Sequence, residues 1–277
     1  MQRYIVLLTA IVLSLPTFAQ PLVLPALSPT STLTQAFSTS KIEISYSRPS
    51  MRGRTIFGDL VPFGKVWRTG ANAATKITFE EAMVIGGSTI APGTYSFYTV
   101  PGESEWEIIL NKNTGNWGAY GYSKTDDVAR FVVKPTKLPS SVETFTISIT
   151  DITFSSCNIE LQWENTRVVV PVVCNNADRL ATAIDKAVNN PSIPYQQAAT
   201  YFNETNQHLD KALEYVSKAL DQNPKAYWNF MLKARIAAKL GKKDVAKTAA
   251  EQAMNAAKGT DAEGEYAAMA KALIESL

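Results

Sequence analysis

Residues 75–111 read TKITFEEAMVIGGSTIAPGTYSFYTVPGESEWEIILN, and this stretch decides the fold. It consists of short runs rich in Ile, Val, Thr, Tyr and Phe, which are separated by Gly-Gly and Pro-Gly dipeptides. β-Branched and aromatic runs bounded by Gly and Pro are typical of strands joined by tight turns. The stretch therefore predicts strands at 75–79, 82–85, 94–100 and 105–111.

The same pattern continues on both sides of this stretch. Apolar residues alternate with polar ones at Ile42, Ile44 and Tyr46, and further strands are predicted at 129–134 and 142–149 and in a hairpin that ends near Cys174. About nine short strands with turns between them favour an antiparallel all-β domain. Both a sandwich and a partly open barrel fit this pattern, and we predict the sandwich.

The composition changes after residue 176. Of the 14 glycines, 11 lie between Gly53 and Gly121, whereas 23 alanines fall between Ala177 and Ala272. Because the apolar period also becomes helical there, we predict an all-α domain after the sandwich. Its predicted helices are 178–189, 195–205, 209–222, 226–239, 243–257 and 261–276.

Two units of this helical region, 193–226 and 227–260, resemble tetratricopeptide repeats. In the first unit, Ala212, Val216 and Pro224 occupy the small, bulky and proline positions of such a repeat. Repeats of this kind bind protein segments or pack on neighbouring helices. The tail is therefore predicted to contact another protein or the sandwich itself.

The N-terminus has the pattern of a secretory signal. Arg3 precedes an apolar run over 4–15, and small residues follow before Gln20. A membrane anchor is the alternative, but about a dozen apolar residues fall short of the roughly 20 that span a bilayer. We predict a signal peptide at 1–19 and a mature protein outside the cytoplasm, periplasmic or secreted, that does not span the membrane. The remaining predicted divisions are an extended leader at 20–33, the β-sandwich at 34–176 and the helical domain at 177–277.

The two cysteines are predicted to form a disulfide. Alternation over 157–163 and a β-branched run over 167–173 predict a hairpin whose pairing places Cys157 opposite Cys174, within disulfide distance. Pro171 cannot donate to the ladder, which leaves a bulge or a longer loop open. Two buried free thiols are the alternative to the disulfide. Without histidine partners, the two cysteines do not predict a zinc site.

The most strongly charged segment of the β region runs from Arg48 to Lys76. It carries six basic residues and one acid, Asp59, whereas the whole chain has a net charge of +2. Planar guanidinium groups donate bidentately to carboxylate, phosphate or sulfate, so this segment predicts an anion site. Alternatively, each arginine holds turn carbonyls or pairs with Glu80, Glu81 or Asp59. The candidate binding residues are Arg48, Arg54, Lys65, Trp67, Arg68 and Asn72.

Several long motifs resemble one bacterial family. They are the run YSRPSMRGRTIFGDLVPFGKVWRTGAN at 46–72, APGTYS at 91–96, the strand from Trp106 to Asn111, and WENT at 163–166. Together they resemble a domain of unknown function, numbered 2911, over roughly residues 28–174. The resemblance implies a β-rich domain in an exported protein of Bacteroidetes-type bacteria, often with a helical-repeat tail. It implies no activity, and therefore no catalytic residue.

The residue types exclude several classes of chemistry. His208 is the single histidine, so a Ser-His-Asp triad or a histidine metal site is not available. Phosphate-binding and nucleophile-elbow motifs are absent from the β region. We therefore predict no catalytic residues, no metal and no cofactor, and the small net charge argues against a nucleic-acid partner.

Two functional hypotheses follow. The first is a non-enzymatic binding or scaffold module of the cell envelope, which binds an anionic small molecule or glycan at the basic segment and an envelope protein through the helical tail. The alternative is a carboxylate-dependent hydrolase of glycans. A Gly/aromatic loop at 113–122 could stack on sugars or a peptide, or fold back on the sandwich. The carboxylates that could form a catalytic pair are Asp59, Glu103, Glu105, Glu107, Asp126 and Asp127.

Overall fold

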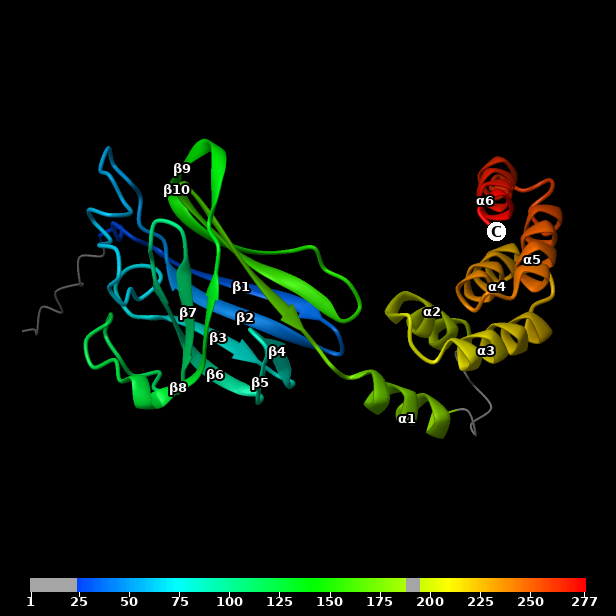
Figure 1. Ribbon diagram of the computed structural model, residues 1–277, viewed down its shortest axis with the longest axis horizontal. Helices are drawn as coiled ribbons and strands as arrows, with labels where there is room; N and C mark the ends of the chain where they lie inside the picture. The colour runs from blue at the N-terminus through cyan, green and yellow to red at the C-terminus, as the bar shows by residue number, and fades with distance from the viewer. Residues whose placement is uncertain (1–23, 188–194) are drawn as a thin grey trace, which may run out of the picture.

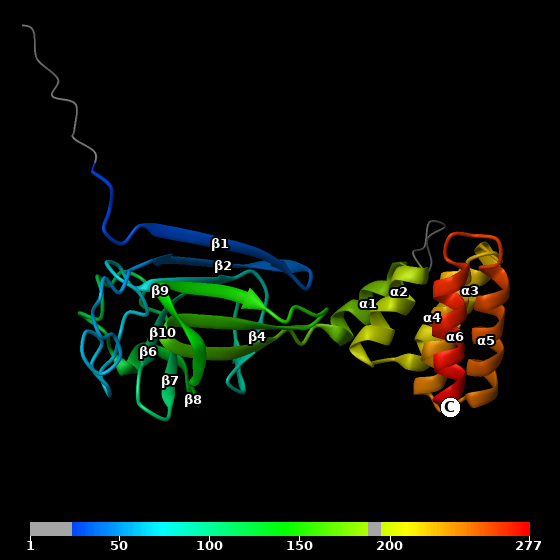
Figure 2. The same cartoon turned by 90° about the horizontal axis from the view of Figure 1, so that it is seen from above.

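The computed structural model describes residues 24–187 and 195–277. These residues form a β domain followed by a helical domain (Figures 1 and 2). The predicted order of an antiparallel β domain and then a helical domain is confirmed. The predicted signal peptide and the first residues of the predicted leader lie outside the described residues.

Two antiparallel sheets make up the β domain. The larger sheet has the strand order β1-β2-β3-β6-β7-β8, and the smaller one has the order β5-β4-β10-β9. Strands of the larger sheet are β1 (Thr30–Phe37), β2 (Ser40–Ser47), β3 (Thr75–Phe79), β6 (Gly93–Val100), β7 (Trp106–Asn111) and β8 (Asp127–Val133). Strands of the smaller sheet are β4 (Met83–Ile85), β5 (Ser88–Ile90), β9 (Thr136–Thr150) and β10 (Ser156–Val173).

Alternating apolar residues of both sheets build one shared core. In β2, Ile42, Ile44 and Tyr46 are buried while the residues between them are half-buried, as the sequence period predicts. From the facing sheet, Ile147 and Ile159 join the same cluster. Because the inner faces of the two sheets pack on one another, the arrangement is a sandwich.

A loop ties the two sheets together at one end of the sandwich. After β2 the chain crosses to the smaller sheet, where the Met51 amide donates to the Glu143 carbonyl at 2.8 Å. The Phe145 amide of β9 in turn donates to the Pro49 carbonyl at 2.9 Å. The chain then returns to the larger sheet, and Trp67 forms a two-way backbone pair with Thr99 of β6. The segment with the highest basic charge thus lies across the end of the sandwich.

The chain reverses within β10. An extended strand of 18 residues would span roughly 60 Å, yet the Cys174 amide donates to the Ser155 carbonyl at 2.7 Å. The buried phase also changes between Trp163 and Val168, and Glu164 between them has a φ of 53°. The predicted hairpin is therefore present, with a bulged turn.

The predicted disulfide is wrong, because Cys157 and Cys174 are both buried free thiols. The backbone bond joins Cys174 to Ser155, two residues away from the predicted partner. A shift of two residues keeps both side chains on one face but makes them diagonal neighbours, whose Cα atoms lie about 7–8 Å apart. Disulfides require a Cα separation of about 4.4–6.8 Å. The irregular turn near Glu164 thus accounts for the failed pairing.

In the part of the helical region that the structure describes, six helices follow the sandwich, close to their predicted ranges. They are α1 (Ala177–Ala187), α2 (Tyr195–Thr205), α3 (Leu209–Gln222), α4 (Tyr227–Lys239), α5 (Lys243–Ala256) and α6 (Glu263–Glu275). From α2 onward each helix packs on the next one along the chain. Buried alanines such as Ala234 and Ala249 allow α4, α5 and α6 to approach closely. The repeat resemblance itself stays a prediction.

Polar contacts join the start of the helical domain to the sandwich. Arg179 of α1 donates to the Glu81 carboxylate at 2.8 Å, and the Tyr201 hydroxyl of α2 donates to the Asn176 side chain at 2.9 Å. Asn176 also bonds to Ser38 in the turn between β1 and β2. Within the described ranges, none of the helices combines the length and apolar character that crossing a bilayer requires.

We expect both thiols to be present and unreactive in the folded protein. Burial raises the pKa of the Cys157 thiol to about 11 and also raises that of Cys174, which keeps both in the protonated, unreactive form at neutral pH. Thiol titration of unreduced protein should detect both groups in denaturant and neither of them quickly in native buffer. If denatured, unreduced protein contains no thiol, the observed register of β10 is incorrect.

Candidate functional site

The basic segment forms a rigid loop, although it has little regular secondary structure. Ile56 is fully buried and Val61 nearly so, and the Val61 amide donates to the Ile56 carbonyl at 2.9 Å. The amides of Ile56 and Phe57 each donate to one oxygen of the Glu164 carboxylate at 3.3 Å. Apolar anchors and a carboxylate from β10 therefore fix the path of the loop.

Four of the six candidate residues line one pocket of about 290 Å³. These are Arg54, Trp67, Arg68 and Asn72. An adjoining pocket of about 180 Å³ adds Lys65 and shares Trp67 and Arg68. We call the two together the arginine pocket. Its remaining lining residues are Ser28, Pro49, Leu60, Val61, Pro62, Val66, Gly70, Ala71, Ala119 and Trp163.

The arginine pocket is lined by cationic groups without acidic ones. Neither lining set contains an aspartate or a glutamate. Of the acids that might have paired with the arginines, Glu80 binds Lys41 at 3.4 Å and Glu81 binds Arg179. In the described part of the chain, Arg54, Lys65 and Arg68 form no ion pair. Their positive charge is therefore available to a ligand.

Backbone carbonyls hold the guanidinium groups in place. Arg54 donates to the carbonyls of Met51 at 2.9 Å and Ser50 at 2.8 Å, and Arg68 Nη1 donates to the Asn72 carbonyl at 2.8 Å. These are the contacts with turn carbonyls that the sequence offers as the alternative to an anion site. They occupy only some of the donors, because a guanidinium has five N–H groups.

Arg48 lies outside the pocket. Its Nε donates to the Phe145 carbonyl at 3.1 Å and its Nη2 to the Thr146 hydroxyl at 2.8 Å, both on β9. It directly follows β2, where the chain crosses between the sheets. Arg48 therefore joins the two sheets and does not converge with Arg54 and Arg68.

Two indole rings form an apolar wall of the pocket. Trp67 and Trp163 stack with ring centroids 5.8 Å apart and planes 17° apart. Each indole N–H is already bonded, in Trp67 to the Gly70 carbonyl and in Trp163 to the Glu143 carbonyl, both at 3.1 Å. Both rings are nearly buried, Trp67 with 8% and Trp163 with 2% of its surface exposed, so they form a rigid apolar base for the pocket and offer no free donor.

The Gly/aromatic loop packs against Arg68 through Gly118. A Cβ placed at Gly118 would lie 2.8 Å from Arg68 Nη1, and the φ of this glycine is +71°. Trp117 and Tyr120 point into solvent, with exposures of 65% and 78%, whereas Tyr122 is half-buried. The loop thus supports the guanidinium with its backbone and leaves two aromatic side chains outside.

A polar cluster around Tyr122 anchors this loop. The Tyr122 hydroxyl donates to Asp127 Oδ2 at 2.7 Å, and Asn111 donates to Asp127 Oδ1 at 2.9 Å. Arg130 binds Asp127, Glu107 and the Tyr122 oxygen. Burial and the hydrogen bond to Asp127 raise the pKa of Tyr122 from its ordinary value of 10 to about 12.

Three of the six carboxylates of the hydrolase alternative are held by basic groups. Asp127 and Glu107 both bind Arg130, and Asp126 lies 3.4 Å from Lys112. Glu103 lines a separate pocket that contains no second carboxylate. Over the residues that the structure describes, histidine, cysteine and acidic side chains do not gather in groups of three that could hold a metal.

A family model described as "Protein of unknown function (DUF2911)" matches residues 28–172. The chain belongs to the DUF2911 family. The match covers the sandwich from the residues before β1 to the end of β10. Comparison with curated proteins and with solved structures found no match.

The sequence did not indicate two residues that shape the arginine pocket of this DUF2911 domain. Trp163 lies in a family motif, but its spacing from Trp67 carries no sign that the two rings stack. Glu164 reads as a turn residue, yet it holds the loop through two backbone amides. The sequence carries no local signal of this role, because the positive φ that turns the Glu164 side chain toward the loop is known only from the structure.

Removing the Tyr122 hydroxyl should destabilise the fold and change its response to alkaline pH. The folded state raises the Tyr122 pKa, so its stabilising effect is complete below pH 10 and is lost as the pH rises through about 12. In urea unfolding at neutral pH, Tyr122→Phe should lower the free energy of unfolding by about 1–2 kcal/mol. Between pH 10 and 12 the difference from wild type should shrink.

Tyr120→Phe is the matched control, because Tyr120 is exposed. It should have no effect at either pH. A Tyr122→Phe difference that stays constant from pH 8 to pH 12 would contradict the raised pKa.

Proposed function

We propose that the DUF2911 domain of this chain is a non-catalytic binding module that holds an anionic ligand in its arginine pocket. One observation carries the proposal: Arg54, Lys65 and Arg68 line two adjoining hollows that share Arg68, and neither lining contains an acid. Clustered cations repel one another and are costly to hold together without a counter-charge. A bound anion removes this repulsion.

The chemistry of the pocket favours a carboxylate or phosphate group attached to an apolar body. Arg68 uses Nη1 for the Asn72 carbonyl, so Nε and Nη2 can donate in parallel to two oxygens of an anion. Leu60, which is 43% exposed and lines both parts of the pocket, then borders the rest of the ligand together with Trp67. An acidic sugar or a small organic acid combines these two features.

The proposal extends to the compartment and the tail. The N-terminal pattern of Arg3, an apolar run and small residues supports export, with the mature chain outside the cytoplasm. The helical domain would contact a second protein of the cell envelope, in keeping with its resemblance to peptide-binding repeats. The polar junction at Arg179 and Asn176 supports a tail held next to the sandwich.

Thermal melting of the protein with and without anions tests the proposal. The probes are inorganic phosphate, sulfate, glucuronic acid, galacturonic acid and muramyl peptides. A ligand at a hundred times its Kd should raise the Tm of wild type by about 5 °C. Arg68→Ala should abolish that rise, because it removes the central guanidinium of the pocket.

Arg52→Ala is the matched control. Arg52 belongs to the same loop and carries the same charge, but it lines neither part of the pocket and donates to the Leu27 carbonyl. It should keep the wild-type response. If no probe shifts the wild-type Tm, or if both variants lose the shift equally, the arginine pocket is not the binding site.

Displacing Arg68 without removing its charge gives an independent prediction. In Gly118→Ala, the new Cβ occupies the space of the guanidinium, which must swing away. Gly87→Ala is its control, because Gly87 has a similar φ of +80° and open space around it. In urea unfolding, both variants should lose about 1–2 kcal/mol from the left-handed conformation. Only Gly118→Ala should weaken anion binding, and equal affinities in the two variants would contradict the packing of Arg68 on Gly118.

A further inference from the structure

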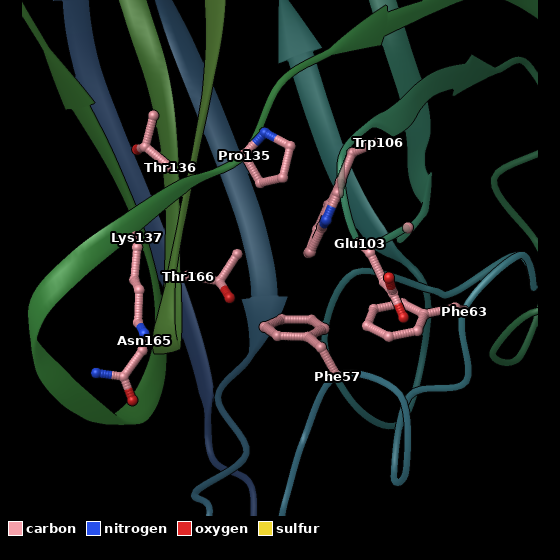
Figure 3. Close-up of a pocket in the computed structure, with 10 residues that line it drawn as sticks. Phe57, Phe63, Glu103, Trp106, Pro135, Thr136, Lys137, Asn165 and Thr166 are labelled. Atoms are coloured by element: carbon pink, nitrogen blue, oxygen red, sulfur yellow. The ribbon is translucent and has the colours of Figure 1, made fainter.

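A second pocket, of about 310 Å³, lies at the same end of the sandwich and has a different character. We call it the aromatic pocket. Figure 3 shows Phe57, Phe63 and Trp106 on one side, and Thr136, Lys137 and Asn165 on the other. Its remaining lining residues are Gly102, Glu103, Pro135 and Thr166. None of these residues belongs to the arginine pocket.

The aromatic wall is fixed before any ligand arrives. Phe57 lies edge-to-face on Trp106 with centroids 4.9 Å apart, and its backbone amide is bonded to Glu164. Phe63 packs on Gly58, where a Cβ would lie 2.8 Å from the ring. The Gly64 amide next to it donates to the Pro101 carbonyl at 2.8 Å. Little conformational entropy is therefore lost when a ligand binds this wall.

An exposed ring held in this way needs an explanation. Phe63 leaves 37% of its surface in water although its neighbours restrict its motion. A solvent-facing aromatic face beside polar groups is typical of a surface that contacts a flat ligand with apolar C–H groups.

The polar groups around the rings include both donors and acceptors. Glu103 supplies a carboxylate, and Lys137 supplies an ammonium group. The Thr166 hydroxyl can donate and accept. One negative and one positive side chain leave the lining without net charge, in contrast to the arginine pocket. Such a set suits ligand hydroxyl groups, which also donate and accept.

We propose that the aromatic pocket binds one neutral pyranose unit of a glycan. The C–H face of the sugar packs on Phe63 and Phe57, and its hydroxyl groups bond to Glu103, Thr166 and Lys137. A volume of about 310 Å³ is at the lower end of the range for ligand sites, which fits a single ring. This site is independent of the anion site, because the two pockets share no lining residue.

Saturation-transfer NMR on the full chain tests the proposal. The probes are the methyl β-glycosides of glucose, galactose, mannose and N-acetylglucosamine. We expect transfer to the ring C–H protons of at least one of them. Phe63→Ala should weaken its binding by about tenfold, which is the effect of losing one stacked ring.

Three further variants make the result decisive. Trp117→Ala removes an aromatic ring that is more exposed and lies outside the pocket, and it should bind as wild type does. Arg68→Ala should also keep glycoside binding, even where anion binding is lost. If Phe63→Ala fails to fold, Lys137→Ala takes its place, because Lys137 is exposed at the rim of the pocket.

The opposing outcomes are equally clear. Absence of transfer to every glycoside, or wild-type affinity in both Phe63→Ala and Lys137→Ala, overturns the proposal. Zwitterionic amino acids, tested in parallel, could bridge Glu103 and Lys137. Binding of phenylalanine or leucine in place of the glycosides would also overturn it.

Discussion

Trp67 and Trp163 stack with nearly parallel rings at the end of the sandwich, one from the loop that covers this end and one from the strand beneath it. Phe57, Trp106 and Phe145 surround the pair with edge-to-face and tilted contacts. Burying one aromatic side chain removes ~150–250 Å² from water, which favours the folded state by about 4–6 kcal/mol before entropy is counted. A loop of nearly 30 residues is held by these rings, and both pockets are formed around them.

The order of strands and helices along the chain could be predicted, because the residues that mark each element and each turn lie next to one another in the sequence. Gly-Gly and Pro-Gly turns separate the β-branched runs, and the alanine-rich helices end at turns that the sequence marks. The sequence prediction missed β1 and β5. In β1 (Thr30–Phe37), Thr, Ser and Gln fill five of the eight positions and only Leu33 and Phe37 are large and apolar, so the run reads as a leader. Pairing with β2 over the full length of the strand makes it a strand.

Register and side-chain direction could not be predicted, because both depend on partners that are distant in the sequence. The hairpin in β10 was visible, but the positive φ at Glu164 was not, and a two-residue shift separates the cysteines. Within the basic segment, closeness in sequence suggested that Arg48, Arg54 and Arg68 converge. Arg48 instead faces Phe145 and Thr146 of β9, nearly a hundred residues away, while Arg54 and Arg68 share a pocket with Trp163.

Glu164 connects the two pockets. The backbone of Glu164 has a φ of 53°, a left-handed conformation that costs a non-glycine residue about 1 kcal/mol or more. Its two carboxylate oxygens accept hydrogen bonds from the backbone amides of Ile56 and Phe57. These charge-assisted bonds offset the strain and fix Phe57 as a wall of the aromatic pocket. Glu164 also directly follows Trp163, whose ring lines the arginine pocket with Arg54 and Arg68. The same two bonds thus place Phe57 for the aromatic pocket and hold the loop that carries Arg54 and Arg68, while Glu164 itself lines neither pocket.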